Sequence, residues 1–425
     1  RWHEDQAKRF ATDAVAVDFN GDLLPDCPIG RLPARTPEQV TAFVRKVIDY
    51  EERPATMTDL RLCLWAGSPG YDPAFDRSAT DMFLTIIRAN APKWATTWLM
   101  SSNPLHALCG WPPDQASRFL SEYKAGCGMA ALIGHGGPRS FYSMVFRGRA
   151  YSLRADQASD ALAKGFPGGP MLILACHSGR FDGPAPSLAE ALLEAAAGPV
   201  AVMAATAESH PLPNLYTGQA MLRLLNERPE RFGDLWLRAH RTARRLRNPA
   251  AENILKMIED NLDGGKIDVD RLKRDQALMY ALLGDPAVRL KMPLPLQVKI
   301  ERMNASPATR PEDSAASPGW RWQVEKPRGA GKDGTAELLV QTRPLVPELP
   351  AAEPFTADAA RRRLRQANEA LKPVTRRTVR LRATWAGVLH QPAVLRFVWL
   401  SGRRLHAAGG ALGKPADDRR PSPAR

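Results

Sequence analysis

Short apolar runs alternate with amphipathic helical segments over the first 290 residues, and this alternation constrains the fold more than any other feature. Six runs are predicted as strands: Ala14–Val17, Leu60–Trp65, Thr96–Met100, Ala130–Ile133, Met171–Ala175 and Val200–Ala204. Helical patterns cover Pro37–Glu52, Asp114–Lys124, Ser187–Ala196 and Leu215–Leu225. Near-continuous apolar strands are typical of a parallel sheet that helices cover on both faces. The sequence therefore predicts an α/β fold with a mostly parallel sheet.

The pattern changes after Leu290, where Pro-, Ser- and Gly-rich stretches separate shorter segments. Strands are predicted at Leu296–Arg302, Trp320–Glu325, Ala336–Thr342, Thr378–Trp385 and Ala393–Leu400, with a basic helix at Ala357–Leu371. The end of the chain is rich in Gly, Pro and Arg, a composition that favours disorder. We therefore predict an α/β domain over residues 1–292, a small β-rich domain with a basic helical insert over 293–406, and a disordered tail over 407–425.

Composition excludes several classes of protein. The chain has 425 residues, of which 44% are hydrophobic and 24% are charged, as in a soluble globular protein. No run of 18 apolar residues exists, which excludes a membrane-spanning helix. The five cysteines are widely spaced and form no CxxC pair, so neither a disulfide scaffold nor a metal site is expected. The first residue is Arg1, so the native N-terminus is not seen and a signal peptide could precede it.

The formal net charge of +14 is concentrated in the last part of the chain. Residues 301–425 hold 23 Arg and Lys against 12 Asp and Glu, so they carry +11 and leave +3 for residues 1–300. A basic region on a near-neutral body predicts attraction to an anionic surface or an acidic partner. No aromatic and basic RNA-binding motif accompanies these arginines, so we expect no nucleic-acid partner.

Two predicted strands end in residues that can carry chemistry. The run 130–133 is followed by Gly134-His135-Gly136, and the run 171–175 is followed by Cys176. Ligands bind beyond the carboxyl ends of the strands in an open α/β sheet, so neighbouring strands would hold the imidazole and the thiol at one cleft. A cysteine thiolate attacks amide carbonyls, and a nearby histidine can move the proton. The backbone amides of Gly136 and Cys176 are candidates for an oxyanion hole.

Each residue of this pair also has a purely structural interpretation. A cysteine at the end of a buried strand is often a small core residue, and His-Gly is common in turns. The pair is more informative than either residue, because each closes an apolar strand and one helix-sized segment separates them.

The chain resembles the gingipain family, within the clan of caspase-like cysteine peptidases. The strand-His-Gly and strand-Ala-Cys pattern is similar to the clan's catalytic dyad. Three further segments carry the narrower resemblance: Asp18–Thr36 with its DFNGDLLPDCPIGRLPART sequence, Leu188–Val202 after the cysteine, and Leu283–Leu290 with its GDPA-x-R motif. The resemblance covers about residues 10–292, with the motifs in the order of the family.

The resemblance implies a caspase- or gingipain-like fold and a cysteine endopeptidase that acts on proteins or peptides. Cys176 would be the nucleophile, His135 its acid/base partner, and the amides of Gly136 and Cys176 the oxyanion donors. Members are often secreted, with a β-sandwich domain after the catalytic one, so residues 293–406 could be immunoglobulin-like. We expect a secreted or periplasmic bacterial protein, with a cytoplasmic location as the alternative.

Asp18, Asn20 and Asp22 begin a calcium-loop spacing in the N-terminal segment of the resemblance. Ile29 stands where the bidentate glutamate of such a loop would be. We therefore expect an ordinary turn and no cofactor for the chemistry, with a structural calcium as the alternative.

The sequence does not assign the residue that orients His135 or the residues that set specificity. An acidic partner could orient His135, and Asp72 and Asp76 follow the strand at 60–65. A pocket for a basic side chain needs a carboxylate and one for an acidic side chain needs a guanidinium. The candidates near the dyad are two acids and two arginines: Asp182, Glu208, Arg139 and Arg180. The sequence does not choose between them.

A second class of function remains beside the peptidase. A catalytically weak relative could serve as a binding or assembly module with the same fold. Intact His135, Gly136 and Cys176 argue against it, because a binding module has no need of all three.

Overall fold

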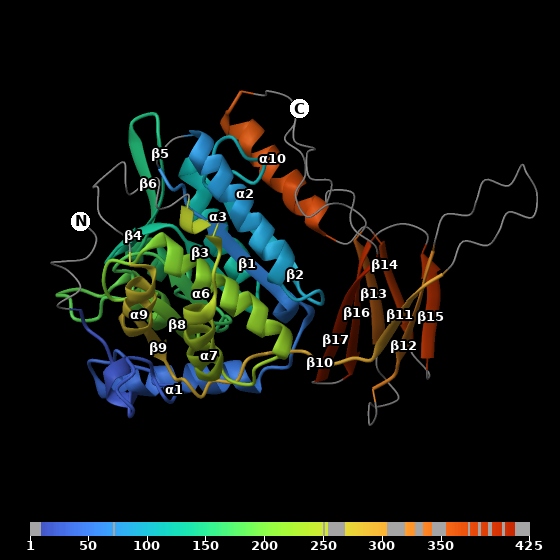
Figure 1. Ribbon diagram of the computed structural model, residues 1–425, viewed down its shortest axis with the longest axis horizontal. Coiled ribbons are helices and arrows are strands. Elements are labelled where there is room, and N and C mark those ends of the chain that lie inside the picture. Colours follow the sequence, from blue (N-terminus) through green and yellow to red (C-terminus); the bar gives the residue numbers. More distant parts are fainter. Residues whose placement is uncertain are drawn as a thin grey trace, which may run out of the picture.

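The computed structural model describes residues 10–70, 73–249, 251–253, 268–303, 319–327, 335–341, 354–372, 375–380, 384–389, 393–401 and 404–412. Its centre is a six-stranded sheet with the order β2-β1-β3-β7-β8-β9 (Figure 1). The strands are β1 (Arg61–Ala66), β2 (Thr96–Ser101), β3 (Met129–Ile133), β7 (Met171–Leu174), β8 (Ala201–Ala205) and β9 (Tyr280–Gly284). All neighbours pair in parallel except β8 and β9. The predicted mostly parallel sheet is thus confirmed.

Helices cover both faces of this sheet. One face packs on α2 (Pro73–Asn90), α6 (Pro211–Leu224) and α7 (Phe232–Arg245), and the other on α3 (Gln115–Lys124), α4 (Ala155–Ala161) and α5 (Leu188–Glu194). Two further helices of the described α/β region are α1 (Pro37–Glu52) and α9 (Val269–Met279), and short 3₁₀ helices lie at Met57–Leu60, Pro112–Asp114 and Leu225–Glu227. Successive residues of a strand point to opposite faces, so Leu172 and Leu174 join the first core and Ile173 the second. Burial on both faces explains why these strands are apolar throughout.

One predicted strand of this region is wrong. Residues Ala14–Val17 form a 3₁₀ helix, η1, in which the Ala16 amide donates to the Asp13 carbonyl over 3.0 Å. Ala14 is buried, whereas Val15 is 55% exposed. A run of four residues with so little burial gains more from a local turn than from pairing with the sheet.

The N-terminal segment and the closing motif of the α/β unit meet at β9. The Arg31 amide donates to the Leu282 carbonyl over 2.9 Å, and the Gly284 amide donates to the Arg31 carbonyl over 2.8 Å. A Cβ atom on Gly30 would lie 2.4 Å from the Gly284 carbonyl oxygen, so only glycine fits there. Two motifs that are about 250 residues apart in the sequence therefore form one contact.

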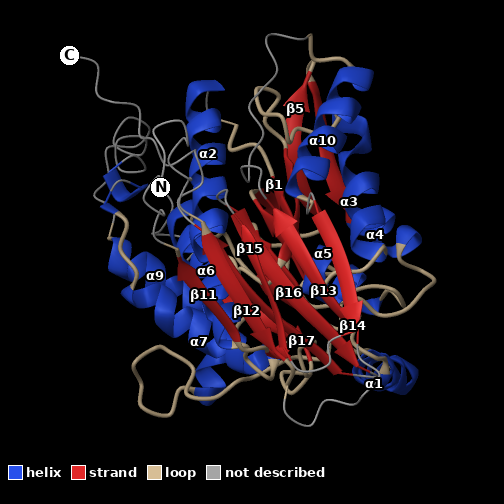
Figure 2. Cartoon of the chain, turned by 90° about the vertical axis from the view of Figure 1, so that its right-hand side faces the viewer, coloured by secondary structure: helices blue, strands red, loops and turns tan. Residues whose placement is uncertain are grey.

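The chain after Leu290 forms two further sheets that pack face to face (Figure 2). The larger has the order β10-β17-β16-β13-β14 and the smaller β11-β12-β15. Their bounds are β10 (Leu294–Pro295), β11 (Val298–Arg302), β12 (Trp320–Glu325), β13 (Thr335–Gln341), β14 (Thr375–Arg380), β15 (Thr384–Leu389), β16 (Ala393–Ser401) and β17 (Arg404–Leu412). Trp322, Phe397 and Trp399 lie in the core between them. The β-rich character of this region is confirmed.

Two details of this region differ from prediction. The predicted single strand Thr378–Trp385 is wrong, because β14 ends at Arg380 in one sheet and β15 begins at Thr384 in the other. The prediction of a disordered tail from residue 407 is wrong for residues 407–412, because β17 continues to Leu412 as the antiparallel neighbour of β16. Residues 413–425 lie outside the described part of the chain, and the division into three segments otherwise stays a prediction.

Helix α10 (Ala357–Leu371), predicted as an insert of the β-rich domain, packs on the α/β unit instead. The Asn368 side chain accepts from the Leu99 amide and donates to the Leu99 carbonyl, both over 2.9 Å. Arg361 pairs with Asp114 over 2.6 Å. Strand β2 is the edge of the six-stranded sheet, and an open edge exposes unpaired backbone groups. The helix therefore covers that edge.

The larger β-sheet also packs against the α/β unit. Val398 and Ala407 join the same core as Trp94, while Arg396 donates from Nε to the Ala95 carbonyl over 2.7 Å. Arg361 and Arg396 thus serve internal contacts, and the predicted attraction of the basic region to an anionic partner stays a prediction. No helix in the described residues is long and apolar enough to cross a membrane.

Strands β4 (His135–Gly137), β5 (Ser140–Phe146) and β6 (Arg149–Arg154) form a small antiparallel sheet at the carboxyl edge of the central one. It begins with the candidate histidine. This connection leads from β3 into the candidate site.

Candidate active site

The candidate nucleophile lies on a tight turn directly after β7. The residue after it, His177, has a left-handed backbone (φ 57°), which is uncommon for a residue other than glycine. Its amide donates to the Ala207 carbonyl over 2.8 Å, and Ser178 Oγ donates to the Ala175 carbonyl over 2.9 Å. These bonds hold the turn, so the position of Cys176 is set by backbone contacts. Non-glycine residues in this conformation cluster at functional sites.

His135 follows β3, the strand that pairs with β7. Its Nε2 atom lies 2.7 Å from the Pro69 carbonyl oxygen. A carbonyl oxygen only accepts hydrogen bonds, so this contact assigns the proton to Nε2 of the neutral ring. The other nitrogen, Nδ1, is then the atom that can take a proton.

Asp76, one of the two predicted orienting acids, bonds to the residues on either side of Pro69, and its predicted role toward His135 stays a prediction. Its Oδ2 atom accepts from Ser68 Oγ over 2.6 Å and from the Gly70 amide over 3.1 Å. These two residues flank Pro69, whose carbonyl receives the histidine. Asp76 is buried, so the clamp is shielded from water. The other predicted acid, Asp72, lies outside the described residues.

The backbones of the two candidate loops approach each other closely at Gly136. A Cβ atom there would lie 2.9 Å from the Cys176 carbonyl oxygen and 2.9 Å from Ala175 Cβ. Only glycine allows this approach, which brings the segment after His135 against the turn of Cys176. The predicted oxyanion role of the two amides stays a prediction.

Ser209, at the carboxyl end of the next parallel strand, contacts the Cys176 thiol. The Ser209 amide donates to Sγ over 3.4 Å, the Ser209 carbonyl lies 3.4 Å from Sγ, and Ser209 Oγ lies 3.8 Å away. Burial raises the pKa of the Cys176 thiol, and the negative charge of Glu208 raises it further. The Ser209 hydrogen bonds lower that pKa. The net shift is upward, so the thiol is protonated at neutral pH.

His135 and Cys176 line one cavity of about 180 Å³. It lies between α2 and α6 at the carboxyl edge of the central sheet. Most of its wall is apolar, and the described lining residues include Pro69, Met82, Phe83, Ile133, Leu174, Ser209 and Leu215. The two predicted catalytic side chains therefore face the same hollow.

None of the four candidates for a charged specificity pocket is among the described residues that line this cavity. Asp182 and Arg180 form an ion pair with each other over 3.0 Å, and both are about half exposed. Arg139 is exposed and donates to the Pro186 carbonyl over 2.8 Å. Glu208 precedes Ser209 and affects the thiol by its charge, but it is not among the residues that line the cavity.

The N-terminal acidic segment forms a self-contained loop. Asp18 accepts from the amides of Gly21, Asp22 and Leu23, over 2.9, 3.2 and 2.9 Å. Asn20 accepts from the Asp22 amide over 2.9 Å. In the described part of the chain, no group of three or more His, Cys, Asp or Glu side chains is arranged to hold a metal ion. The expectation of an ordinary turn without calcium stays a prediction.

The sequence did not single out several residues of the site. Ser209 follows a predicted strand end, so the rule that found Cys176 could have found it too. Ile133 and Leu174, the last residues of β3 and β7, lie two positions before His135 and Cys176 and line the same cavity. Pro69 contributes its backbone carbonyl, for which a sequence carries no signal.

Comparison with known proteins gives two findings. Peptidase family C25 matches residues 3–291 of the chain. Among solved structures, the chain is similar to the Arg-specific cysteine proteinase gingipain R, with 13% identity, a TM-score of 0.51, and coverage of 94% of this chain and 78% of that one. A complex of the pro- and mature domains of RgpB from Porphyromonas gingivalis gives 15% identity, a TM-score of 0.48, and coverage of 94% and 80%. No curated protein matches the sequence. At such identities the first likeness shows a common fold, and the second carries no argument.

Proposed function

The chain belongs to peptidase family C25 and is a cysteine peptidase; from this premise we propose that it is an endopeptidase in which Cys176 forms a thioester and His135 moves the protons. One observation carries the proposal. His135 and Cys176 follow neighbouring parallel strands and line one cavity. Neither a buried structural cysteine nor a turn histidine requires this arrangement.

The first half of the reaction makes the thioester. His135 Nδ1 takes the Cys176 proton as Sγ bonds to the scissile carbonyl carbon, and the carbonyl oxygen gains the negative charge. The amides of Gly136 and Cys176 would bind that oxygen, where each donor typically lowers the barrier by about 2.7–4 kcal/mol. The C–N bond then breaks, and the amine leaves with the proton from Nδ1.

The second half releases the acid. Water attacks the thioester carbonyl while Nδ1 takes its proton, and the C–S bond breaks as the proton returns to Sγ. The raised pKa of the thiol supports this general-base route, because a protonated thiol must lose its proton as it attacks. Pro69, held by Asp76, would keep the other ring proton on Nε2, so that Nδ1 is the nitrogen that takes and returns the proton.

The test is cleavage of a peptide library, with the wild type compared with Cys176→Ala and His135→Ala. We expect cleavage within the peptides, and a loss of about 10⁴-fold or more in kcat for Cys176→Ala. An electrophilic peptide should label Cys176 in the wild type. Cys63, Cys109 and Cys127 are buried and serve as internal controls for the labelling.

The outcomes separate the alternatives. Folded wild type that neither cleaves nor labels would favour a binding or assembly module. Labelling without turnover would indicate a zymogen with a live nucleophile. If the protein removed only single residues from the ends of peptides, it would be an exopeptidase and not an endopeptidase.

We also propose that the protein acts outside the cytoplasm. The resemblance to the gingipain family supports this location. Fractionation of the source bacterium tests it, and recovery in the cytoplasm would refute it.

A further inference from the structure

A network of buried polar residues leads from β9 to the thiol of Cys176. Its members come from four elements: Ser209 from the loop after β8, Asn214 from α6, Gln276 from α9 and Tyr280 from β9. Each of these four side chains is at most 4% exposed. Burial of a polar side chain is unfavourable unless it is hydrogen-bonded. The direction of the hydrogen bonds in this polar network therefore shows what the network holds in place.

The Asn214 amide has a fixed orientation within the polar network. Its Oδ1 atom accepts from the Tyr280 hydroxyl over 2.6 Å and from Gln276 Nε2 over 2.8 Å. An amide carries one acceptor oxygen and one donor nitrogen, so Nδ2 is on the opposite side. There it donates to Ser209 Oγ over 3.0 Å. Tyr280 and Gln276 thus turn the donor end of Asn214 toward Ser209.

The Ser209 hydroxyl extends this direction to the sulfur. Asn214 Nδ2 donates to its oxygen, and the Tyr280 hydroxyl lies 3.5 Å from the same atom. A hydroxyl has one hydrogen, which is free to point away from the groups that donate to its oxygen. Ser209 Oγ donates this hydrogen to Cys176 Sγ over 3.8 Å. The Ser209 amide donates to the same sulfur over 3.4 Å, so two donors of one residue converge on the thiol.

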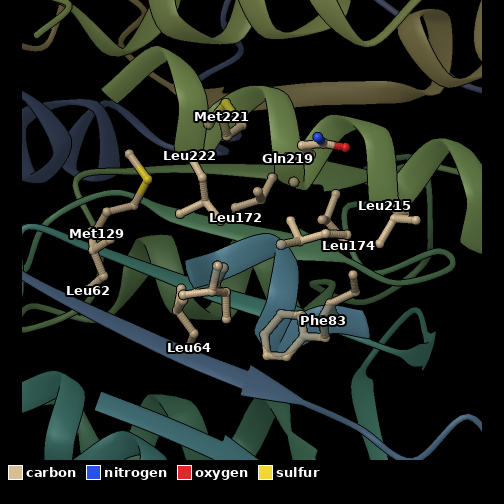
Figure 3. Close-up of a pocket in the computed structure, with 15 residues that line it drawn as sticks. Leu62, Leu64, Phe83, Met129, Leu172, Leu174, Leu215, Gln219, Met221 and Leu222 are labelled. Atoms are coloured by element: carbon tan, nitrogen blue, oxygen red, sulfur yellow. The ribbon is translucent and has the colours of Figure 1, made fainter. Parts of the chain in front are cut away.

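Apolar packing fixes the distance between the polar network and the nucleophile. Helix α6, which carries Asn214, packs on β7, the strand that ends just before Cys176. Figure 3 shows Leu215 of α6 and Leu174 of β7 in the wall of one apolar cavity of about 50 Å³. A Cβ atom on Gly218 would lie 3.1 Å from Leu174 Cδ1, so the helix approaches the strand closely. Asn214 and Cys176 are therefore carried by two elements that pack directly on each other.

The groups around the thiol act on its proton in opposite directions. Burial and the charge of Glu208 raise the pKa of Cys176, whereas the Ser209 hydrogen bonds lower it. The Ser209 carbonyl, 3.4 Å from Sγ, can accept only from the protonated thiol. His135 lines the same cavity and takes the proton in the proposed reaction. The two Ser209 donors thus favour negative charge on the sulfur.

We propose that Ser209 is a further catalytic residue, whose hydroxyl donates to the Cys176 sulfur as negative charge develops there. Asn214 and Tyr280 are the positioning residues that aim this hydroxyl. The inference rests on the proposed function. As the S–H bond breaks, its proton goes to His135 Nδ1 and its electron pair forms the bond to the carbonyl carbon, while Ser209 keeps its own proton. The hydrogen bond is stronger to a charged sulfur than to a neutral thiol, so it lowers the barrier.

Ser209→Ala removes the hydroxyl and keeps both backbone contacts to the sulfur. We expect the pH profile of Cys176 alkylation by iodoacetamide to move to higher pH, because the thiolate loses a donor. We also expect kcat to fall about three- to tenfold, with a smaller change in KM, since the hydrogen bond strengthens as the charge develops. Mass spectrometry follows alkylation on the Cys176 peptide, because Cys27 is also partly exposed.

Tyr280→Phe tests the positioning role, since it removes only the hydroxyl that bonds to Asn214. We expect the alkylation profile to move in the same direction by a smaller amount. The matched control is Tyr216→Phe, because Tyr216 is also fully buried and its hydroxyl donates to Glu252 over 2.5 Å instead. In the Ser209→Ala background, Tyr280→Phe should leave the profile unchanged, because Tyr280 acts through Ser209. Equal shifts in both backgrounds would refute the positioning role.

The failures of the two proposals are distinguishable. If the folded wild type cleaves no peptide, the proposed function fails and the catalytic role of Ser209 falls with it. If the wild type cleaves and Ser209→Ala matches it in both alkylation profile and kcat, only the role of Ser209 is refuted. Thermal unfolding separates this role from a structural one. A variant with the wild-type Tm and a shifted profile supports the inference, whereas a lowered Tm with an unshifted profile refutes it.

Discussion

The two parts of the chain both bury a sheet on its two faces, yet only the first gathers chemical groups at one edge. In the α/β unit, β3, β7 and β8 run in parallel, so the residues after them meet: His135, Cys176 and Ser209. In the C-terminal part, β13, β14, β16 and β17 alternate in direction. Their carboxyl ends are divided between two edges. Strand direction, more than burial, decides where a catalytic group can form.

The polar residues of the second part have a different task. Arg396 and Asn368 bond to backbone groups of Ala95 and Leu99 in the first part. They attach the C-terminal sheet and α10 to the edge of the catalytic sheet. We therefore expect changes in the first part to alter rates and changes in the second to alter stability.

The largest expected effect in the C-terminal part comes from a substitution of Arg396. Arg396→Leu removes the donor to the buried Ala95 carbonyl and should lower the free energy of unfolding by about 2–3 kcal/mol. Burial lowers the pKa of Arg396 to about 10, which indicates how strongly the site is desolvated. Thermal unfolding measures the loss. Arg404→Leu, at an exposed position of β17, is the control. A large fall in kcat for Arg396→Leu with unchanged stability would contradict the expectation that changes in the second part alter stability.

The next effect concerns the clamp around Pro69. Asp76→Asn removes the charge from the oxygen that accepts both hydrogen bonds, so both become weaker and the Pro69 carbonyl is held less firmly. We expect kcat to fall about 10- to 100-fold with a smaller change in KM. Asp81→Asn, on an exposed face of α2, should change neither. If Asp76→Asn altered stability alone, its role would be structural.

The smallest effect tests the electrostatics of the thiol. The Glu208 charge raises the pKa of Cys176, so Glu208→Gln should lower that pKa. The thiolate then forms at lower pH, and the rate of alkylation on the acidic side should rise by less than about tenfold. The rate of thiol alkylation against pH measures the shift, and Asp182→Asn is the control. A shift toward higher pH would show that Glu208 affects the thiol by another route.

Much of the fold was predictable because burial imposes patterns. Helices 37–52 and 357–371 match α1 and α10 in both bounds, and Thr36 and Thr356 cap their first turns. The sheet containing β3 and β7 followed from apolar runs. The position of α10 was not predictable, because an amphipathic helix does not specify which surface it covers. The break between β14 and β15 was missed for a similar reason: both segments have the composition of strands.

The candidate site likewise contains residues that the sequence predicted and residues that it did not. His135 and Cys176 were found because parallel strand ends converge, and that rule depends on side-chain types. Pro69 contributes a backbone carbonyl, for which residue type gives no indication. Asp76 was a candidate because it is acidic, but its contacts with Ser68 and Gly70 could not be predicted from residue type. The charged specificity candidates were chosen by closeness in sequence to the dyad, whereas the cavity is lined by Ile133 and Leu174 at the ends of β3 and β7.

The contact between Arg31 and β9 has a consequence for synthesis. Tyr280, the first residue of β9, donates to Asn214, which in turn bonds to Ser209 beside the thiol. The ribosome must therefore release the chain through β9 before the environment of Cys176 is complete, since chains emerge from the N-terminus. While the chain is nascent, Arg31 and Gly30 lack the strand that they pair with. We expect the nucleophile to be assembled late, which would delay activity until the whole α/β unit has left the ribosome.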